Sequence, residues 1–213
     1  MPTQWEAAVR SRRPKQLTIF GTPGLKSAWG AAFVRRTLDQ FNALSGTNTL
    51  GLTLIEGNQA PEPNGNGGAD VQIDVSTGNH SFNFQGNQTG SLLPPPNING
   101  KCHTVSQGGE IIRAFIFVPI RPTTESGGRE IGTGLKVAIT LHELLHACGL
   151  HESDPGHDIG LNDPDLFRTG ASADFNFPPD GNPGDRLILG FNRFTPPFFL
   201  TARTAGLVRG NWP

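Results

Sequence analysis

The segment from Leu135 to Cys148 constrains the fold of this chain more than any other. It is apolar around most of the circumference of a helix but carries two histidines and a glutamate, and Gly149 follows it as a helix terminator. A helix that is apolar on nearly all sides is buried, and polar groups on a buried helix need partners. We therefore predict that this helix lies in the core and that its polar residues form a site.

Three polar residues of this helix, two histidines and a glutamate, are spaced for metal binding. His142 and His146 are four residues apart, so their imidazoles project from one face about a turn apart and can hold one tetrahedral metal ion. Glu143 lies roughly 100° around the helix from His142, within reach of a water molecule on that ion. The pattern predicts two metal ligands and a general base.

Zinc is the expected ion, because imidazole is a borderline donor and because hydrolysis needs a Lewis acid without redox chemistry. Water bound to zinc has a pKa near ~7, so a carboxylate can deprotonate it at neutral pH for attack on a peptide carbonyl. A catalytic zinc has three protein ligands, so a third must follow the helix. His151 is the first choice, because Gly149 permits the chain to turn back; Glu152 and His157 are the alternatives.

The remaining elements follow from apolar periodicity and turn residues. Residues 27–44 predict one amphipathic helix, and residues 200–209 a final helix. Strands are expected at residues 50–55, 71–75, 102–105 and 111–118, the last of them central because it is apolar on both faces. Residues 57–68 and 78–100 are expected to be loops, and a glycine- and proline-rich loop region of about 45 residues follows Gly149.

The stretch from His142 to Gly156, HELLHACGLHESDPG, resembles the active-site segment of the metzincin peptidases, especially the matrixin branch, whose pattern is HExxHxxGxxH. The resemblance implies a role for each matching residue: zinc ligands at His142, His146 and His151, a general base at Glu143, and a turn at Gly149. It also implies an α+β, zincin-like fold. That fold has a twisted, mostly parallel sheet with an antiparallel edge strand, an active-site helix, a backing helix, and a long C-terminal loop region ending in a helix.

Two further segments resemble strands of this family in their pattern of apolar and polar residues. Residues 69–73 look like its third strand, and residues 102–105 look like its substrate-pairing edge strand. An extended peptide would add to that edge by backbone hydrogen bonds. Substrate binding is therefore expected at four residues: Cys102, His103, Thr104 and Val105.

The chain departs from the family pattern in two places. His151 comes one residue early, so Glu152 stands at the position of the third histidine. The family also has a methionine turn beneath the metal, whereas the sole methionine here is Met1. Ile159 or residues 187–189 would have to supply that floor.

Other candidate ligands have lesser support. His80 and His103 are expected to be surface or edge-strand histidines, although the resemblance also allows a second zinc between them. Calcium is considered because six aspartates of the C-terminal loops offer oxygen donors, but none follows the EF-hand spacing. These aspartates are Asp154, Asp158, Asp163, Asp165, Asp180 and Asp185.

Composition limits the partners and the organisation. A net charge of -1 without a basic stripe gives no reason to expect nucleic acid or an anionic membrane. The 213 residues predict a single catalytic domain, with residues 1–16 as a flexible arm. No secretory signal or long apolar run stands out, so we expect a soluble chain that is cytoplasmic or secreted by another route. Two cysteines make no disulfide framework, and compartment and oligomeric state stay open.

The function predicted from these features is zinc-dependent endopeptidase activity on a protein or peptide substrate. One alternative is a non-catalytic binding or structural protein stabilised by zinc; Glu143 argues against it, and the missing methionine favours it. The other alternative is a zinc amidohydrolase that acts on a small amide or a cell-wall peptide.

Overall fold

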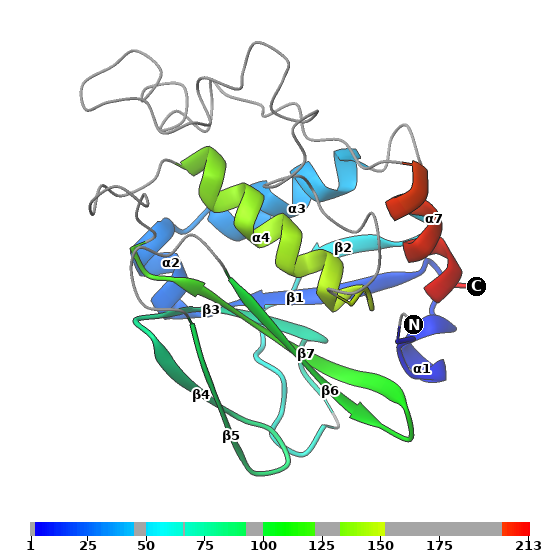
Figure 1. Cartoon of the computed structure of the whole chain (residues 1–213), viewed down its shortest axis with the longest axis horizontal. Helices are drawn as coiled ribbons and strands as arrows, with labels where there is room; N and C mark the ends of the chain where they lie inside the picture. Colours follow the sequence, from blue (N-terminus) through cyan, green and yellow to red (C-terminus); the bar gives the residue numbers. More distant parts are fainter. Residues whose placement is uncertain (1–2, 45–49, 66, 93–99, 122–132, 152–201) are drawn as a thin grey trace.

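The computed structural model describes residues 3–44, 50–65, 67–92, 100–121, 133–151 and 202–213 (Figure 1). Its main sheet has five strands in the order β2-β1-β3-β7-β6. These strands are β1 (Gln16–Gly21), β2 (Thr53–Glu56), β3 (Val71–Ser76), β6 (Lys101–Gln107) and β7 (Glu110–Pro119). A separate hairpin consists of β4 (Asn79–Asn83) and β5 (Asn87–Ser91). The helices are α1 (Ala7–Arg10), α2 (Pro23–Trp29), α3 (Phe33–Leu44), α4 (Thr133–Ala147) and α7 (Ala202–Asn211).

The sheet is mostly parallel, with one antiparallel edge strand. Strand β1 runs parallel to β2 and β3, β3 runs parallel to β7, and β6 pairs with β7 in the antiparallel direction. The register of β6 against β7 runs from Lys101 opposite Phe117 to Gln107 opposite Glu110, with an irregularity between Val105 and Ser106. The predicted α+β class, with a mostly parallel sheet and an antiparallel edge strand, is therefore confirmed.

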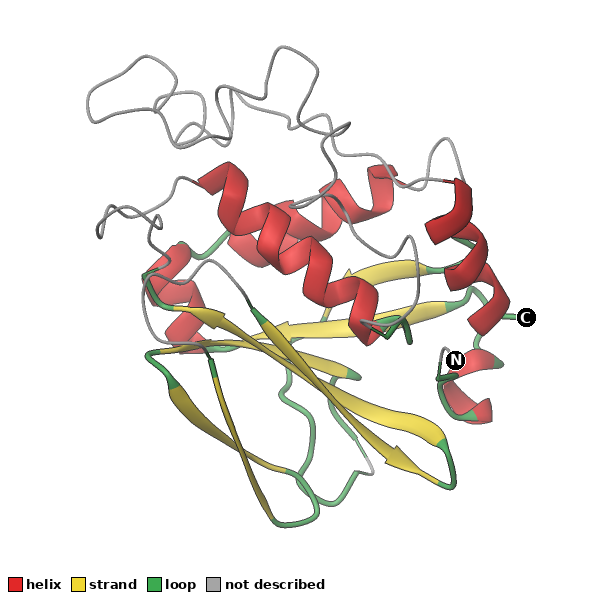
Figure 2. Cartoon of the chain, in the orientation of Figure 1, coloured by secondary structure: helices red, strands yellow, loops and turns green. Residues whose placement is uncertain are grey.

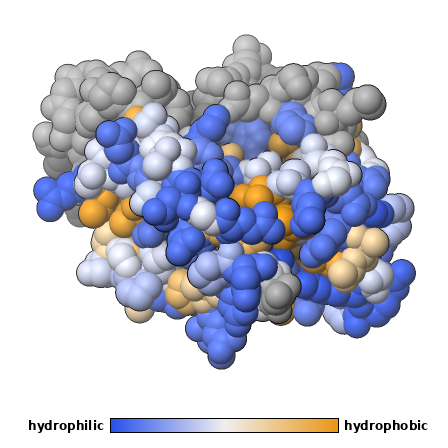
Figure 3. Space-filling model, turned by 90° about the horizontal axis from the view of Figure 1, so that it is seen from below, coloured by the Kyte–Doolittle hydropathy of each residue, from blue (hydrophilic) through white to orange (hydrophobic). Residues whose placement is uncertain are grey.

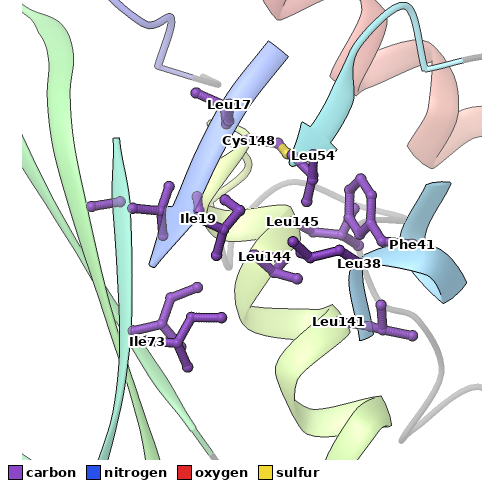
Figure 4. Close-up of a cluster of buried hydrophobic side chains, with 14 of the residues drawn as sticks. Leu17, Ile19, Leu38, Phe41, Leu54, Ile73, Leu141, Leu144, Leu145 and Cys148 are labelled. Carbon is purple, nitrogen blue, oxygen red and sulfur yellow. The ribbon is translucent and has the colours of Figure 1, made fainter. Parts of the chain in front are cut away.

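Helices α3 and α4 cover one face of the sheet, and the β4–β5 hairpin lies on the other side (Figure 2). The main core lies between the sheet and the helices, where Leu144 and Leu145 of α4 pack among Ile19 of β1 and Phe41 of α3 (Figure 4). A second, aromatic cluster lies under the hairpin and includes Phe82, Phe84, Leu92, Ile112, Phe115 and Phe117.

Strand β7 separates these two clusters. Ala114, Ile116 and Val118 contribute to the main core, whereas Phe115 and Phe117 contribute to the aromatic cluster. Because successive side chains of a strand point to opposite faces, both faces of β7 are buried. This explains why the prediction of a central strand from its continuous apolar run is correct.

The surface is mainly hydrophilic. Among the described large hydrophobic residues, Ile55 and Ile120 are the exposed ones. The face seen in Figure 3 shows small apolar patches separated by polar residues. No helix within the described ranges is long and apolar enough to cross a membrane.

The expectation of a flexible arm at residues 1–16 is wrong for the residues that the structure describes. Trp5 is 0% exposed and Val9 is 1% exposed, and Trp5 forms an isolated parallel bridge with Ile111. Two basic side chains of this segment also form ion pairs. Arg12 pairs with the buried Asp70 at 2.5 Å, and Arg10 pairs with Glu110 at 2.7 Å. Apolar burial and these ion pairs fix the segment to the sheet.

Three further local expectations are corrected. The single helix expected at residues 27–44 is two helices, because Gly30 has φ +99° and ends α2 in a conformation that favours glycine. Strand β1 was not predicted, although Leu17 and Ile19 alternate with less buried residues. The loop expected at residues 78–100 contains the β4–β5 hairpin, which is anchored by the buried Phe82.

The C-terminal end of α4 is closed by residues from both ends of the chain. The Trp5 indole N–H donates to the carbonyl oxygen of Ala147 at 2.7 Å, and the Trp212 indole donates to that of Cys148 at 3.3 Å. The Gly149 carbonyl accepts from the Thr3 amide at 3.0 Å and from the Asn211 side chain at 3.2 Å. The last carbonyls of a helix lack partners within the helix, so these donors satisfy them. Figure 1 shows both termini beside this end of α4.

The substitution Trp5→Phe tests this closure. It keeps most of the buried ring and removes the donor to Ala147, so the free energy of unfolding should fall by about 1–3 kcal/mol in urea denaturation. Trp29→Phe is the matched control, because its indole donates to the Ile120 carbonyl at an exposed position. That control should cost less than about 1 kcal/mol. Equal losses in the two variants would contradict the assignment.

Candidate metal centre

The two histidines of α4 converge on one point. His142 Nε2 and His146 Nε2 are 3.1 Å apart, and both side chains are half-buried. Two zinc–nitrogen bonds of ~2.0–2.1 Å at a tetrahedral angle place the nitrogens about 3.3 Å apart. The donor set and its spacing therefore fit a zinc ion, although their role as ligands stays a prediction.

The opposite faces of α4 hold the helix in this orientation. Leu141, Leu144 and Leu145 are each 0% exposed and pack into the main core (Figure 4). Because residues at three- and four-residue spacings share a face of a helix, this apolar stripe turns His142 and His146 toward the other side. The packing of α4 thus decides where its polar residues point.

A contact with a backbone carbonyl sets the tautomer of His146. Its Nδ1 is 2.8 Å from the Leu150 carbonyl oxygen. A carbonyl oxygen only accepts hydrogen bonds, so Nδ1 carries the proton, and Nε2 of the neutral ring keeps its lone pair. Histidine ligands of metal ions commonly have such a partner on their second nitrogen.

The candidate general base lies in a pocket beside this pair. Glu143 is only 5% exposed, and it lines a pocket of about 360 Å³ together with His146. The facing wall of the pocket comes from β6, which contributes Cys102 and Thr104. Burial raises the pKa of the Cys102 thiol well above its usual range, and the negative charge of Glu143 raises it further. The structure thus brings the helix and the predicted substrate strand to one pocket.

The four predicted substrate-binding residues separate by face. Cys102 and Thr104 line the pocket beside α4, whereas His103 and Val105 lie against the aromatic cluster on the other side of the sheet. This is the alternation expected of a strand. Only two of the four side chains can therefore reach a peptide in this pocket, although all four backbones lie on the edge strand.

The turn predicted after the helix is present. Gly149 has φ +99°, a conformation that favours glycine, and a Cβ built on it would lie 2.2 Å from the Thr3 carbonyl oxygen. The turn brings the exposed His151 to the same pocket as Glu143 and His146. His151 Nε2 lies 2.7 Å from the Thr3 hydroxyl oxygen.

The third ligand is not resolved by these positions. Within the described ranges, no group of three or more histidine, cysteine, aspartate or glutamate residues is arranged to hold a metal ion. Glu152 and His157, the alternative ligands, lie outside the described residues, as do the six aspartates considered for calcium and the two candidates for the floor of the site.

Sequence reasoning did not identify Thr3 as part of the site. Thr3 lines the pocket, donates its amide to Gly149, and contacts His151 across 148 positions of sequence. A lone threonine near a chain end carries no local signal for such a contact. Lys101 also lines the pocket. It lies one residue before the predicted strand and was not among the predicted site residues.

A second pair of histidines lies on the other side of the sheet. His80 Nε2 and His103 Nε2 are 2.9 Å apart, and the His80 ring stacks on Phe117 with centroids 3.8 Å apart. A Cβ added to Gly90 of β5 would lie 2.6 Å from both Nε2 atoms. His103 thus lies on the edge strand, as expected, and the hairpin brings His80 against it.

Burial lowers the pKa of both His80 and His103, and neighbouring groups also shift each pKa. The His103 pKa is also lowered by His80 and Lys101, while Gly78 and Asp74 partly offset the effect at His80. A lowered pKa in the folded state means that the unfolded chain takes up protons first as the pH falls. Stability should therefore be complete above the unfolded histidine pKa of about 6.5 and should decline below it.

The variant His103→Gln should lose part of this pH dependence. Urea midpoints measured between about pH 7.5 and pH 5, with a chelator present, should fall less in His103→Gln than in the wild type. His151→Gln, which removes a histidine of the other pocket, is the control. The same slope in His103→Gln and the wild type would refute the assignment.

No family model, no curated protein and no solved structure matches this chain.

Proposed function

We propose that this chain is a zinc-dependent endopeptidase of the metzincin type. The observation that carries this proposal is the convergence of His142 Nε2 and His146 Nε2, 3.1 Å apart, beside the buried carboxylate of Glu143. All three residues lie on one helix, and Glu143 and His146 line a pocket whose facing wall is the edge strand β6. The mostly parallel sheet and its antiparallel edge strand are also features that the sequence resemblance implies.

Each residue of the helix has a distinct part in the proposed reaction. His142 and His146 would hold the zinc ion, with the His146 ring oriented by its contact to the Leu150 carbonyl. Zinc, when bound, supplies Lewis acidity and brings the pKa of its water to about 7. Glu143 accepts a proton from the attacking water molecule and returns it to the leaving amine. Its position inside the pocket keeps this exchange away from bulk solvent.

The edge strand supplies the means of binding a peptide. Strand β6 pairs with β7 along one side, and its other side is unpaired by any described strand. An extended substrate can add to such an edge through backbone hydrogen bonds, which recognise any sequence. The side chains of Cys102 and Thr104 would then contribute to selection, because both line the pocket.

His151 remains the proposed third ligand. It follows the turn at Gly149 and lines the same pocket as His146. The Thr3 hydroxyl at 2.7 Å is positioned to orient its ring. Glu152 and His157 stay as alternatives.

Removing the general base tests the reaction. Glu143→Gln should reduce cleavage of casein or of a peptide library by roughly 10²–10⁴-fold, because proton transfer is lost, while zinc content stays at one ion per chain. Glu56→Gln, which removes a surface carboxylate paired with Lys26 on the far edge of the sheet, is the matched control. Full activity in Glu143→Gln, or purified wild type without zinc, would refute the proposal.

The third ligand can be identified by zinc affinity. His151→Ala should weaken zinc binding by at least about 100-fold, since a direct ligand contributes more than a residue that only orients one. Glu152→Gln and His157→Ala should each retain affinity within a few-fold of the wild type. Competition with a chromogenic chelator measures all three. A large loss in either alternative variant, with little change in His151→Ala, would reassign the ligand.

A further inference from the structure

A glycine immediately before β6 lies directly against the proposed general base. A Cβ built on Gly100 would lie 2.6 Å from Glu143 Cγ and 3.0 Å from both Cδ and Oε1. Real Cβ atoms essentially never approach another heavy atom within 3.0 Å. Any residue with a Cβ at position 100 would therefore collide with the Glu143 side chain in its present position.

Backbone conformation does not require glycine at this position. Gly149 and Gly30 have φ +99°, where other residues are strained, but Gly100 is not among the glycines with positive φ. An alanine could adopt this backbone, so the limiting factor is the space that Glu143 occupies.

The tertiary structure holds both β6, which follows Gly100, and helix α4, which carries Glu143. Strand β6 is fixed by pairing with β7 in unbroken register from Lys101, the residue after Gly100, to Val105. Helix α4 is fixed by its buried leucines and by the indoles that close its end. The close atoms include Glu143 Cγ, which is near the backbone and moves only when the side chain leaves its rotamer. An added methyl group at Gly100 would thus turn the carboxylate away from its present direction.

We propose that Gly100 is a positioning residue, whose missing side chain lets β6 close over Glu143 and hold the carboxylate in the pocket beside His146. This inference rests on the proposed function. Gly100 touches neither the substrate nor the metal in this role, because it acts through Glu143. The residue before β6 would thereby align the general base, and β6 itself would bind the substrate.

The activity test compares Gly100→Ala with the wild type as zinc-loaded full-length chains. We expect kcat to fall roughly 10- to 100-fold, because a displacement of about 1 Å at a reacting group has that effect, whereas KM changes little. In a Glu143→Asp background, which shortens the side chain by one methylene, Gly100→Ala should cause a clearly smaller further loss. Ser106→Ala, at an exposed position of the same strand, should leave both constants unchanged.

A stability cycle tests the contact without activity. Gly100→Ala should lower the urea midpoint of the zinc-free chain in the wild-type background but not in a Glu143→Ala background, where the colliding atoms are absent. If Gly100→Ala fails to fold while the double variant folds, the contact is supported. If both fail to fold, or if the two backgrounds lose equal stability, the inference is overturned.

The two proposals fail in different ways. A wild-type chain that binds no zinc and cleaves no peptide overturns the proposed function and this inference with it. An active wild type with an unchanged kcat in Gly100→Ala overturns the inference alone. A rise in KM with an unchanged kcat also overturns it, since that result would place Gly100 in substrate binding.

Discussion

The closure of the C-terminal end of α4 is the constraint on which the rest of the structure depends. Two indole donors, Trp5 and Trp212, reach consecutive carbonyls of this end, and the next carbonyl accepts from Thr3 and Asn211. These bonds join the two ends of the chain to the helix that carries the candidate site. They fix the end of α4 where the chain must turn sharply, so the position of the turn is set by long-range contacts.

That turn has chemical consequences. The Leu150 carbonyl lies just beyond it and accepts from His146 Nδ1, which leaves Nε2 able to bind a metal ion. His151 follows immediately and meets the Thr3 hydroxyl. The residues that hydrogen-bond to the last carbonyls of α4 thereby set the tautomer of His146 and the location of His151.

The sheet separates two histidine pairs of different character. On β6, Cys102 faces the pocket of α4, and the next residue, His103, faces His80 under the hairpin. One strand thus contributes to a candidate catalytic pocket on one face and to a half-buried imidazole pair on the other. Both result from simple alternation along an edge strand whose neighbour β7 is buried on both sides.

Local pattern was sufficient for α4, for the turn at Gly149 and for strands β3 and β7, because helical and strand periodicities are set by neighbouring residues. It also placed His142 and His146 on one face, a consequence of helical geometry alone. Strand β1, the β4–β5 hairpin and the burial of Trp5 were missed. Tertiary packing decided these elements, since their stability comes from partners far along the chain. The contacts of Thr3 with His151 and of Gly100 with Glu143 are likewise products of the fold, because no local rule links residues so distant in sequence.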